Sequence, residues 1–342
     1  MRQQVLAAVG AIALVVGAVV VRGTIEGDDD DGGGGGGGGD AAVVCPPELR
    51  ATCETLADDR ELRIEDTATT TEALVAAAGT DDVEPAVWLV PAPLADAVRS
   101  ERDDPEGEAV VGEPTAPLAR SPVALVIWED RAAALEAGAC AGTVEWRCLG
   151  DAADRPWTDV GGEATWGRLK VGVTDPDTAT GTVVLGGATA GYFDSPDYAS
   201  NDFDASLAGW LGALGADAAA ADQGDPVDLM ITRGPGEFSA VGALEAEART
   251  AAGRADLRVL YPAPVATADL VAVPIGDAGG AADDVAGDDD LRGALATAGW
   301  RVEGEATAPG VDADASLPAD DDGLPGGGVL RALVALWNDT TG

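Results

Sequence analysis

The sequence contains no histidine, and this absence removes several classes of enzyme mechanism at once. Ser-His-Asp triads, Cys-His nucleophile pairs and the H-E-x-x-H zinc helix all need an imidazole, as do most side-chain proton shuttles near neutral pH. Paired carboxylates could still hydrolyse a glycosidic bond, but among 61 acidic residues the nearness of two in sequence identifies no pair. An exported hydrolase is therefore the least favoured function, and we expect no catalytic residues.

Positive charge is also scarce. One lysine, Lys170, is present, and 20 basic residues stand against 61 acidic ones, for a formal net charge of −41. Nucleic acid binding needs clustered Lys and Arg side chains against the phosphates, so nucleic acid is excluded as a partner. A surface this acidic stays soluble at high ionic strength. A salty external habitat and a compositional bias of the genome both explain it, and the sequence does not choose between them.

The acidic clusters do not have the spacing of a metal site. Asp175-Pro176-Asp177 begins like a calcium-binding EF-hand loop, but Ala179 and Thr180 stand where a ligand and the invariant glycine belong. The runs from Asp288 to Asp290 and from Asp320 to Asp322 are interpreted as solvated loops. The sequence therefore predicts no metal site and no cofactor.

The N-terminal segment places the rest of the chain outside the cytosol. The run from Val5 to Val21 carries no charge and has the length of a short membrane-spanning helix. Arg2 precedes this run and the aspartates from Asp28 to Asp31 follow it, so the positive-inside rule keeps the N-terminus in the cytosol. The glycines from Gly32 to Gly39 then form a flexible tether.

We therefore expect residues 1–22 to be a signal anchor that passes once through the membrane and residues 23–40 to be an acidic, Gly-rich linker. The folded part would be extracellular, at the cell membrane. The alternative is a cleaved signal peptide and a secreted protein. The segment from Val19 to Arg22 lacks the small residues of a cleavage site, which favours the uncleaved anchor.

The four cysteines fall into two sequence pairs, Cys45 with Cys53 and Cys140 with Cys148. An oxidising compartment favours disulfides, so two are expected. Four cysteines allow three connectivities, and the spacing alone does not choose among them. A zinc site is disfavoured because the spacing is unusual for zinc and no histidine can complete the ligand set.

After the tether, short apolar strands alternate with helices along the chain. This alternation is typical of an α/β fold in which a parallel sheet is covered on both faces. The expected strands are residues 41–45, 62–64, 87–90, 123–128, 170–173, 229–232, 241–244, 257–261 and 270–273. The expected helices are residues 47–57, 72–78, 94–99, 131–137, 179–192, 207–214, 291–298 and 329–337.

The order of these segments resembles that of type II periplasmic solute-binding proteins. Within this family, the resemblance is greatest to the molybdate-binding branch. Four stretches carry the resemblance, which covers nearly all of residues 41–302. Two of them, Ala119 to Val126 and Arg254 to Ile275, are similar to the segments that cross between the two lobes of that family. The other two are Thr67 to Val98, with its hydroxyl run and apolar strand, and Trp166 to Pro176.

The resemblance implies two Rossmann-like lobes joined by two crossovers, with a ligand cleft between them. Lobe 1 would comprise residues 41–119 plus 262–342, and lobe 2 residues 120–261. Each cysteine pair then lies within one lobe. Because a disulfide between lobes would restrict their closure, the resemblance implies the local pairs Cys45–Cys53 and Cys140–Cys148.

Ligands of open α/β sheets bind beyond the carboxyl ends of the strands, where helix N-termini present unpaired N–H groups. Together with the resemblance, this rule gives six candidate ligand-binding residues. Each has a structural alternative, because the same residue types cap helices, start strands or pack between lobes. The six are Thr69, Thr70, Ser121, Thr178, Thr180 and Tyr261.

The resemblance implies a membrane-tethered extracellular solute-binding protein, which captures a small molecule or ion and delivers it, for example, to a membrane permease. A second interpretation is a cell-surface interaction or sensory ectodomain that keeps the fold without a transport ligand. Its candidate contact residues are Trp88, Trp128, Trp146, Trp157 and Trp166.

Overall fold

The computed structural model describes residues 41–102, 104, 109–218, 224–251, 253–254, 256–312 and 322–341. The predicted anchor, residues 1–22, and the predicted linker, residues 23–40, lie outside the described residues. Within the described part of the chain, no helix is long and apolar enough to cross a membrane.

A mixed sheet runs through the molecule in the order β2-β1-β3-β8-β4-β6-β5, with β7 also paired to β4. Neighbours within the trio β2, β1 and β3 are parallel, as are β5 and β6, whereas β8 and β4 lie antiparallel to the strands beside them. The predicted α/β fold class is confirmed, but the prediction of a parallel sheet is wrong: among the described strands, β8 and β4 run antiparallel to the strands beside them and make the sheet mixed. The strands are β1 (Ala42–Cys45), β2 (Leu62–Ile64), β3 (Ala86–Pro91), β4 (Ala119–Trp128), β5 (Val171–Val173), β6 (Ala240–Leu244), β7 (Leu257–Leu260) and β8 (Thr267–Ile275).

The strand β4 connects the two halves of the sheet. Residues 119–122 pair with residues 267–270 of β8, and the next residues, 123–127, pair with β6. Strand β8 is paired on its other edge with β3. We call β1, β2, β3 and β8 the first half and β5, β6 and β7 the second half; β4 leads into the second half, and the chain between β7 and β8 leads back. These are the two predicted crossovers.

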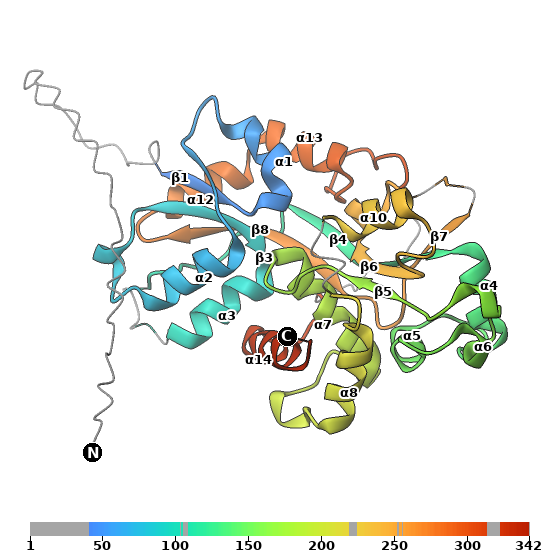
Figure 1. The fold of residues 1–342 in the computed structure, drawn as a ribbon. Coiled ribbons are helices and arrows are strands. Elements are labelled where there is room, and N and C mark those ends of the chain that lie inside the picture. The colour runs from blue at the N-terminus through green and yellow to red at the C-terminus, as the bar shows by residue number, and fades with distance from the viewer. Residues whose placement is uncertain are drawn as a thin grey trace, which may run out of the picture. The chain divides into compact units, whose positions relative to one another are not determined.

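Helices cover both faces of the sheet, and α3 and α12 each pack against β3 and β8 (Figure 1). In the second half α7 packs against β5 and β6, and α4 against β4 and β7. The α-helices are α1 (Arg50–Cys53), α2 (Thr67–Ala76), α3 (Ala92–Arg102), α4 (Glu129–Ala137), α5 (Trp146–Ala152), α6 (Trp157–Val160), α7 (Ala179–Phe193), α8 (Ala205–Leu214), α10 (Pro226–Arg233), α11 (Glu245–Ala248), α12 (Gly279–Ala286), α13 (Asp289–Ala298) and α14 (Gly327–Thr341). Short 3₁₀ turns are η1 (Pro47–Leu49), η2 (Glu54–Leu56), η3 (Thr80–Asp82), η4 (Ala164–Trp166) and η5 (Ser200–Asp202).

Helix α7 is buried all round, because every residue from Ala179 to Gly191 is buried. Its small side chains allow this. A Cβ atom on Gly186 would lie 2.6 Å from the Leu330 side chain of α14, and one on Gly187 would lie 3.2 Å from Val123 of β4. The run of small residues therefore lets α7 lie between the sheet and the C-terminal helix.

The C-terminal helix α14 packs against helices of both halves. One is α3, which packs on β3 and β8 of the first half; the others are α7 and α8, which pack on strands of the second half. The first residue of α14, Gly327, touches the backbone of α3. A Cβ atom there would lie 2.3 Å from the Ala97 nitrogen and 2.4 Å from the Pro93 carbonyl oxygen. At this position only glycine permits the close approach of the two helices.

One predicted strand is wrong. Residues 229–232 belong to α10, which begins after Asp225. The Asp225 carboxylate accepts a hydrogen bond from the Asp228 nitrogen at 2.8 Å, and Pro226 occupies the first helical turn, where its missing N–H costs nothing. The Asp-Pro start signal therefore outweighs the short apolar run that follows it. The predicted helix over 47–57 is also interrupted, forming η1, α1 and η2 in succession.

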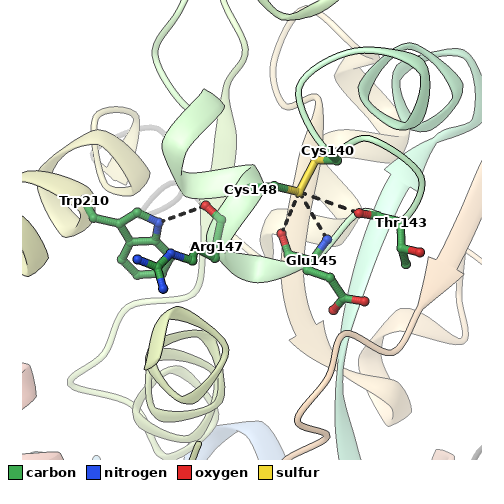
Figure 2. Close-up of a disulfide and its surroundings, with 6 residues drawn as sticks. All are labelled: Cys140, Thr143, Glu145, Arg147, Cys148 and Trp210. Carbon is green, nitrogen blue, oxygen red and sulfur yellow. Dashed lines mark hydrogen bonds between the residues drawn. A yellow bond between two sulfur atoms is a disulfide. The ribbon is translucent and has the colours of Figure 1, made fainter. Parts of the chain in front are cut away.

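Both local disulfides form. Cys45–Cys53 links the end of β1 to α1, and both residues are fully buried. Cys140–Cys148 closes the loop before α5 and is half-buried, with the Cys148 Sγ atom accepting a hydrogen bond from the Glu145 nitrogen at 3.3 Å (Figure 2). The same sulfur lies 3.2 Å from the Glu145 carbonyl oxygen, and because a disulfide sulfur carries no proton this is a contact rather than a hydrogen bond.

Candidate functional site

A pocket of about 100 Å³ lies where segments of the two halves of the sheet meet. One water needs roughly 10–15 Å³ of such volume, so the pocket has room for a small ligand. The first half contributes residues from the loop after β1 and the end of β3, and the second half contributes the start of α7 and α11. The lining residues are Pro46, Glu48, Leu49, Thr52, Pro91, Ala179, Thr180, Leu244, Ala246, Glu247, Leu270, Ala298 and Trp300.

Glu48 reaches the pocket from η1, directly after β1. Pro47 is the first residue of this turn. The turn lies between Cys45 and Cys53 in sequence, and the buried disulfide between these two residues joins the ends of the loop that carries it. The Glu48 side chain is exposed, and its Oε1 atom accepts a hydrogen bond from the Thr180 nitrogen at 3.5 Å. This is a contact between the two halves across the pocket.

Thr180 lies in the first turn of α7, where N–H groups have no partner within the helix. The Thr178 hydroxyl caps the helix by accepting from the Gly181 nitrogen at 3.0 Å, and it donates to the Asp175 carbonyl oxygen at 2.7 Å. The chain turns tightly here, because a Cβ atom on Gly181 would lie 1.9 Å from the Asp175 carbonyl oxygen. Thr178 thus supports the turn, and Thr180 presents its nitrogen to Glu48.

Glu247 also lines the pocket, and it lies on the short helix α11. Its carboxylate accepts a hydrogen bond from the Leu244 nitrogen at 3.2 Å and another from the Thr180 side chain. Burial raises the pKa of Glu247 to about 8, with a further contribution from the negative charge of Asp225 and a smaller one from Glu48. The hydrogen bonds act in the opposite direction because they favour the carboxylate.

The rest of the pocket is mostly apolar. Leu49, Leu244 and Leu270 come from three different elements, and the buried Trp300 follows α13. Such a lining removes water from a bound molecule, whereas Glu48, Glu247 and Thr180 provide the polar contacts. The arrangement can therefore hold a small molecule in a fixed orientation.

Of the six residues predicted from the sequence, Thr180 lines this pocket and Thr178 caps the helix that carries it. Ser121 is fully buried, and its hydroxyl accepts from the Ala246 nitrogen at 3.1 Å. It therefore supports α11 from β4. Tyr261 donates a hydrogen bond from its hydroxyl to Glu245, at the segment that leads back to the first half.

Thr69 and Thr70 lie in α2, away from the residues that line this pocket. Thr69 is exposed, and the Thr70 hydroxyl donates to Glu65 at 3.4 Å. Their neighbours Thr67 and Thr71 line a second pocket of about 280 Å³, between α2, α3, α14 and the start of α7. The hydroxyl oxygen of Thr67 is buried there without a hydrogen-bond partner among the described residues.

Sequence reasoning missed Glu48, Glu247 and Trp300. Glu48 follows Cys45-Pro46-Pro47, and this position after the first strand is a local signal that could have identified it. Glu247 has no such signal among so many acidic residues, because only the packing of α11 brings it to the pocket.

The candidate tryptophans of the alternative interpretation occupy two kinds of place. Trp88, Trp146 and Trp157 are buried in the core, with at most 1% of their surface exposed. Trp128 and Trp166 are half-buried, and the Trp128 Nε1 atom donates to the Phe238 carbonyl oxygen at 3.1 Å. Three of the five are therefore unable to contact a partner in this structure.

Comparison of the sequence with protein-family models finds no match, and comparison with curated proteins finds none either. Solved structures share the fold. The periplasmic binding protein P5PA has 13% identity and a TM-score of 0.52, over 89% of this chain and 100% of its own. The ferric binding protein from Campylobacter jejuni has 7% identity and a TM-score of 0.52, over 87% and 99%. FutA (IdiA) from Trichodesmium, in complex with iron and citrate, has 8% identity and a TM-score of 0.50, over 88% and 97%. The chain therefore has the fold of periplasmic solute-binding proteins.

Proposed function

We propose that this chain is an extracellular solute-binding protein that captures a small ligand in the pocket between its two halves. The observation that carries the proposal is the composition of that pocket. Residues of both halves line the pocket, and the two crossovers connect these halves. Closure of one half on the other would therefore enclose a ligand. The fold shared with periplasmic binding proteins supports the proposal.

The moving parts we propose are lobe 1, residues 41–119 plus 262–342, and lobe 2, residues 120–261. Helix α14 belongs to lobe 1 by this division, yet it packs against α7 and α8 of lobe 2. It therefore restrains the opening of the lobes on the side of the second pocket. The hydrogen bond between Glu48 and Thr180 restrains the opening of the lobes at the first pocket.

The cellular setting we propose is the outer side of a membrane, with the chain held by residues 1–22 through the linker of residues 23–40. Two disulfides favour an oxidising compartment outside the cytosol. We propose delivery to a membrane permease as the use of the bound ligand. Extraction of membranes with alkaline carbonate tests the anchor: the full chain should remain in the pellet, whereas a cleaved signal would release it.

The ligand class is tested by thermal unfolding of the oxidised full-length chain in a mild nonionic detergent. The panel contains oxyanions such as molybdate, sugars, amino acids, amines and metal ions including Fe³⁺. A ligand at a hundred times its dissociation constant stabilises the folded state by about 2.7 kcal/mol. A shift with one class, together with a more compact form in solution scattering, supports the proposal. No shift with any compound, for a folded protein, contradicts it and favours the interaction ectodomain.

A further inference from the structure

Thr180 contacts two carboxylates that come from different halves of the fold and line the first pocket. Its nitrogen donates to Glu48 from the first half, and its side chain hydrogen-bonds Glu247 from the second. Glu48 and Glu247 are the only charged residues that line the pocket in the described part of the chain, and both are acidic. A ligand in this pocket therefore meets hydrogen-bond acceptors and negative charge.

An anionic ligand does not fit this arrangement. The N-terminus of α7 is the element that would attract an anion. Here the Thr178 hydroxyl accepts from the Gly181 nitrogen, and the Glu48 carboxylate accepts from the Thr180 nitrogen. The chain thus supplies its own anion at this helix end. Asp225 adds further negative charge beside Glu247.

A bare metal ion does not fit either. Calcium takes 6–8 oxygen ligands, and iron and similar ions need several donors in a fixed geometry. The described residues contain no group of three or more Asp, Glu, Cys or His side chains placed to hold a metal ion. Most lining side chains of the pocket are hydrocarbon or indole, which cannot replace the water shell of such an ion.

We infer that the pocket binds a small organic cation, an ammonium group carried on a short apolar body, with Glu48 and Glu247 as its charged partners. This inference rests on the proposed function. The ammonium group donates hydrogen bonds to the two carboxylates, and the apolar body lies against Leu49, Leu244 and Trp300. Tryptophan is also the side chain whose ring attracts an ammonium ion most strongly.

The test compares three unbranched compounds of four carbon atoms with different polar groups: n-butylammonium, 1-butanol and butanoate. Binding is measured by calorimetry at constant ionic strength, with the oxidised full-length chain in detergent. Tetramethylammonium, 1,4-diaminobutane and ammonium complete the set of cations. We expect at least one of the four cations to bind, and n-butylammonium to bind at least tenfold more tightly than 1-butanol or butanoate.

Two variants locate the site. At pH 9, above the pKa of Glu247, Glu48→Gln and Glu247→Gln each remove one negative charge and keep an oxygen acceptor, and each should weaken cation binding at least tenfold. Glu54→Gln is the matched control, because Glu54 is an exposed residue of η2 outside the pocket lining, and it should leave binding unchanged. Glu48 is exposed, so its variant leaves the core intact even if Glu247→Gln folds poorly.

The outcomes separate the inference from the proposed function. If another class of compound in the wider panel binds and Glu247→Gln affects its binding, the pocket is functional but the organic cation is wrong. The same holds if butanoate or a metal ion alone binds more tightly than all four cations. If no compound of the panel binds at all, the proposed function fails together with the inference.

Discussion

The guanidinium of Arg301 binds the carboxylate of Glu245 through two hydrogen bonds, from Nε to Oε2 at 2.8 Å and from Nη2 to Oε1 at 2.9 Å. The Glu245 side chain is fully buried, and it also accepts from the Tyr261 hydroxyl and from the Asp312 nitrogen at 3.0 Å. The backbone of Arg301 forms an antiparallel β-bridge with Arg120 of β4, in the first crossover. Since Glu245 is the first residue of α11, the ion pair connects α11 to that crossover.

Replacing Arg301 by leucine should cost about 3–5 kcal/mol in the free energy of unfolding, because it leaves the buried Glu245 carboxylate without its cation. Urea unfolding at pH 7 measures the loss. Arg168→Leu makes the same change in charge at an exposed ion pair with Asp154 and should cost less than about 1 kcal/mol. Equal losses in the two variants would show that the buried pair does not stabilise the fold.

The high pKa of Glu247 predicts how its contribution to stability changes with pH. The pKa is about 8 in the folded state, against an ordinary value of 4.5, so between these values the folded protein binds more protons than the unfolded chain. Stability from this group is therefore present at pH 4 to 5 and is lost as the pH rises toward 8. The free energy of unfolding of Glu247→Gln, minus that of the original protein, should therefore increase from pH 5 to pH 8.5. Urea unfolding of both proteins at each pH measures this difference. A difference that does not change with pH would contradict the raised pKa.

Cation binding should depend on pH for the same reason. A cation favours the ionised form of Glu247, so it lowers the pKa of that group and releases a proton on binding. Asp225, directly before α10, and Glu48, in η1, are the acidic groups whose charge acts on Glu247. Affinity for n-butylammonium should rise up to tenfold per pH unit from pH 6 to pH 8 and then level off. Calorimetry in two buffers of different ionisation enthalpy counts the protons released, and a count of zero would contradict this linkage.

The two disulfides should differ in their effect on binding. Replacing either pair with alanine should cost about 2–3 kcal/mol of stability, because each closes a loop of similar length. Loss of Cys45–Cys53 should also weaken ligand binding, because that loop carries Glu48. Loss of Cys140–Cys148 should leave binding unchanged, since no residue of its loop lines the pocket.

The same two disulfides should also differ in reactivity. Cys140–Cys148 is half-buried, whereas Cys45–Cys53 is fully buried, so a mild reductant should open Cys140–Cys148 first. Alkylation followed by mass spectrometry gives the order, and the reverse order would show that burial does not control it.

Two adjacent glycines provide a test of the packing of α14. Gly327→Ala places a methyl group against the backbone of α3 and should cost about 2 kcal/mol or more, because backbone atoms cannot move aside. Gly328→Ala has only the Ser100 hydroxyl within 4.0 Å and should change stability by less than about 0.5 kcal/mol. Similar melting temperatures for the two variants would show that α14 does not approach α3 so closely.

The strands were predictable because their signal is local, whereas the two crossovers were implied only by the resemblance to solute-binding proteins. Buried strands such as Val87 to Val90 and Val123 to Trp128 appear in the sequence as unbroken apolar runs. The sequence predicts a strand where α10 forms, because residues 229–232 are a short, mostly apolar run, and the signal for a helix lies before that run in Asp225 and Pro226. Helix α5 was missed because Gly150 interrupts its pattern; a Cβ there would lie 2.0 Å from Trp210.

The pocket was predictable only in part. Thr180 follows a turn at the start of a helix, so its position is visible in the sequence. Glu48 and Glu247 are far apart in the chain, and only tertiary packing brings them to Thr180. In a sequence with 61 acidic residues, composition and spacing do not distinguish the few acidic residues that line a binding site from the many on the surface.

The position of β8 between β3 and β4 determines when the first half can be completed. Strands β1, β2 and β3 leave the ribosome early, but the strand that pairs with the free edge of β3 is residues 267–275. Everything in between must be synthesised first, so a nascent chain carries an unpaired, apolar strand edge for most of its translation. Completion of the fold depends on contacts that are distant in sequence, which makes folding slow and favours protection of the growing chain by a chaperone until the last helices have been made.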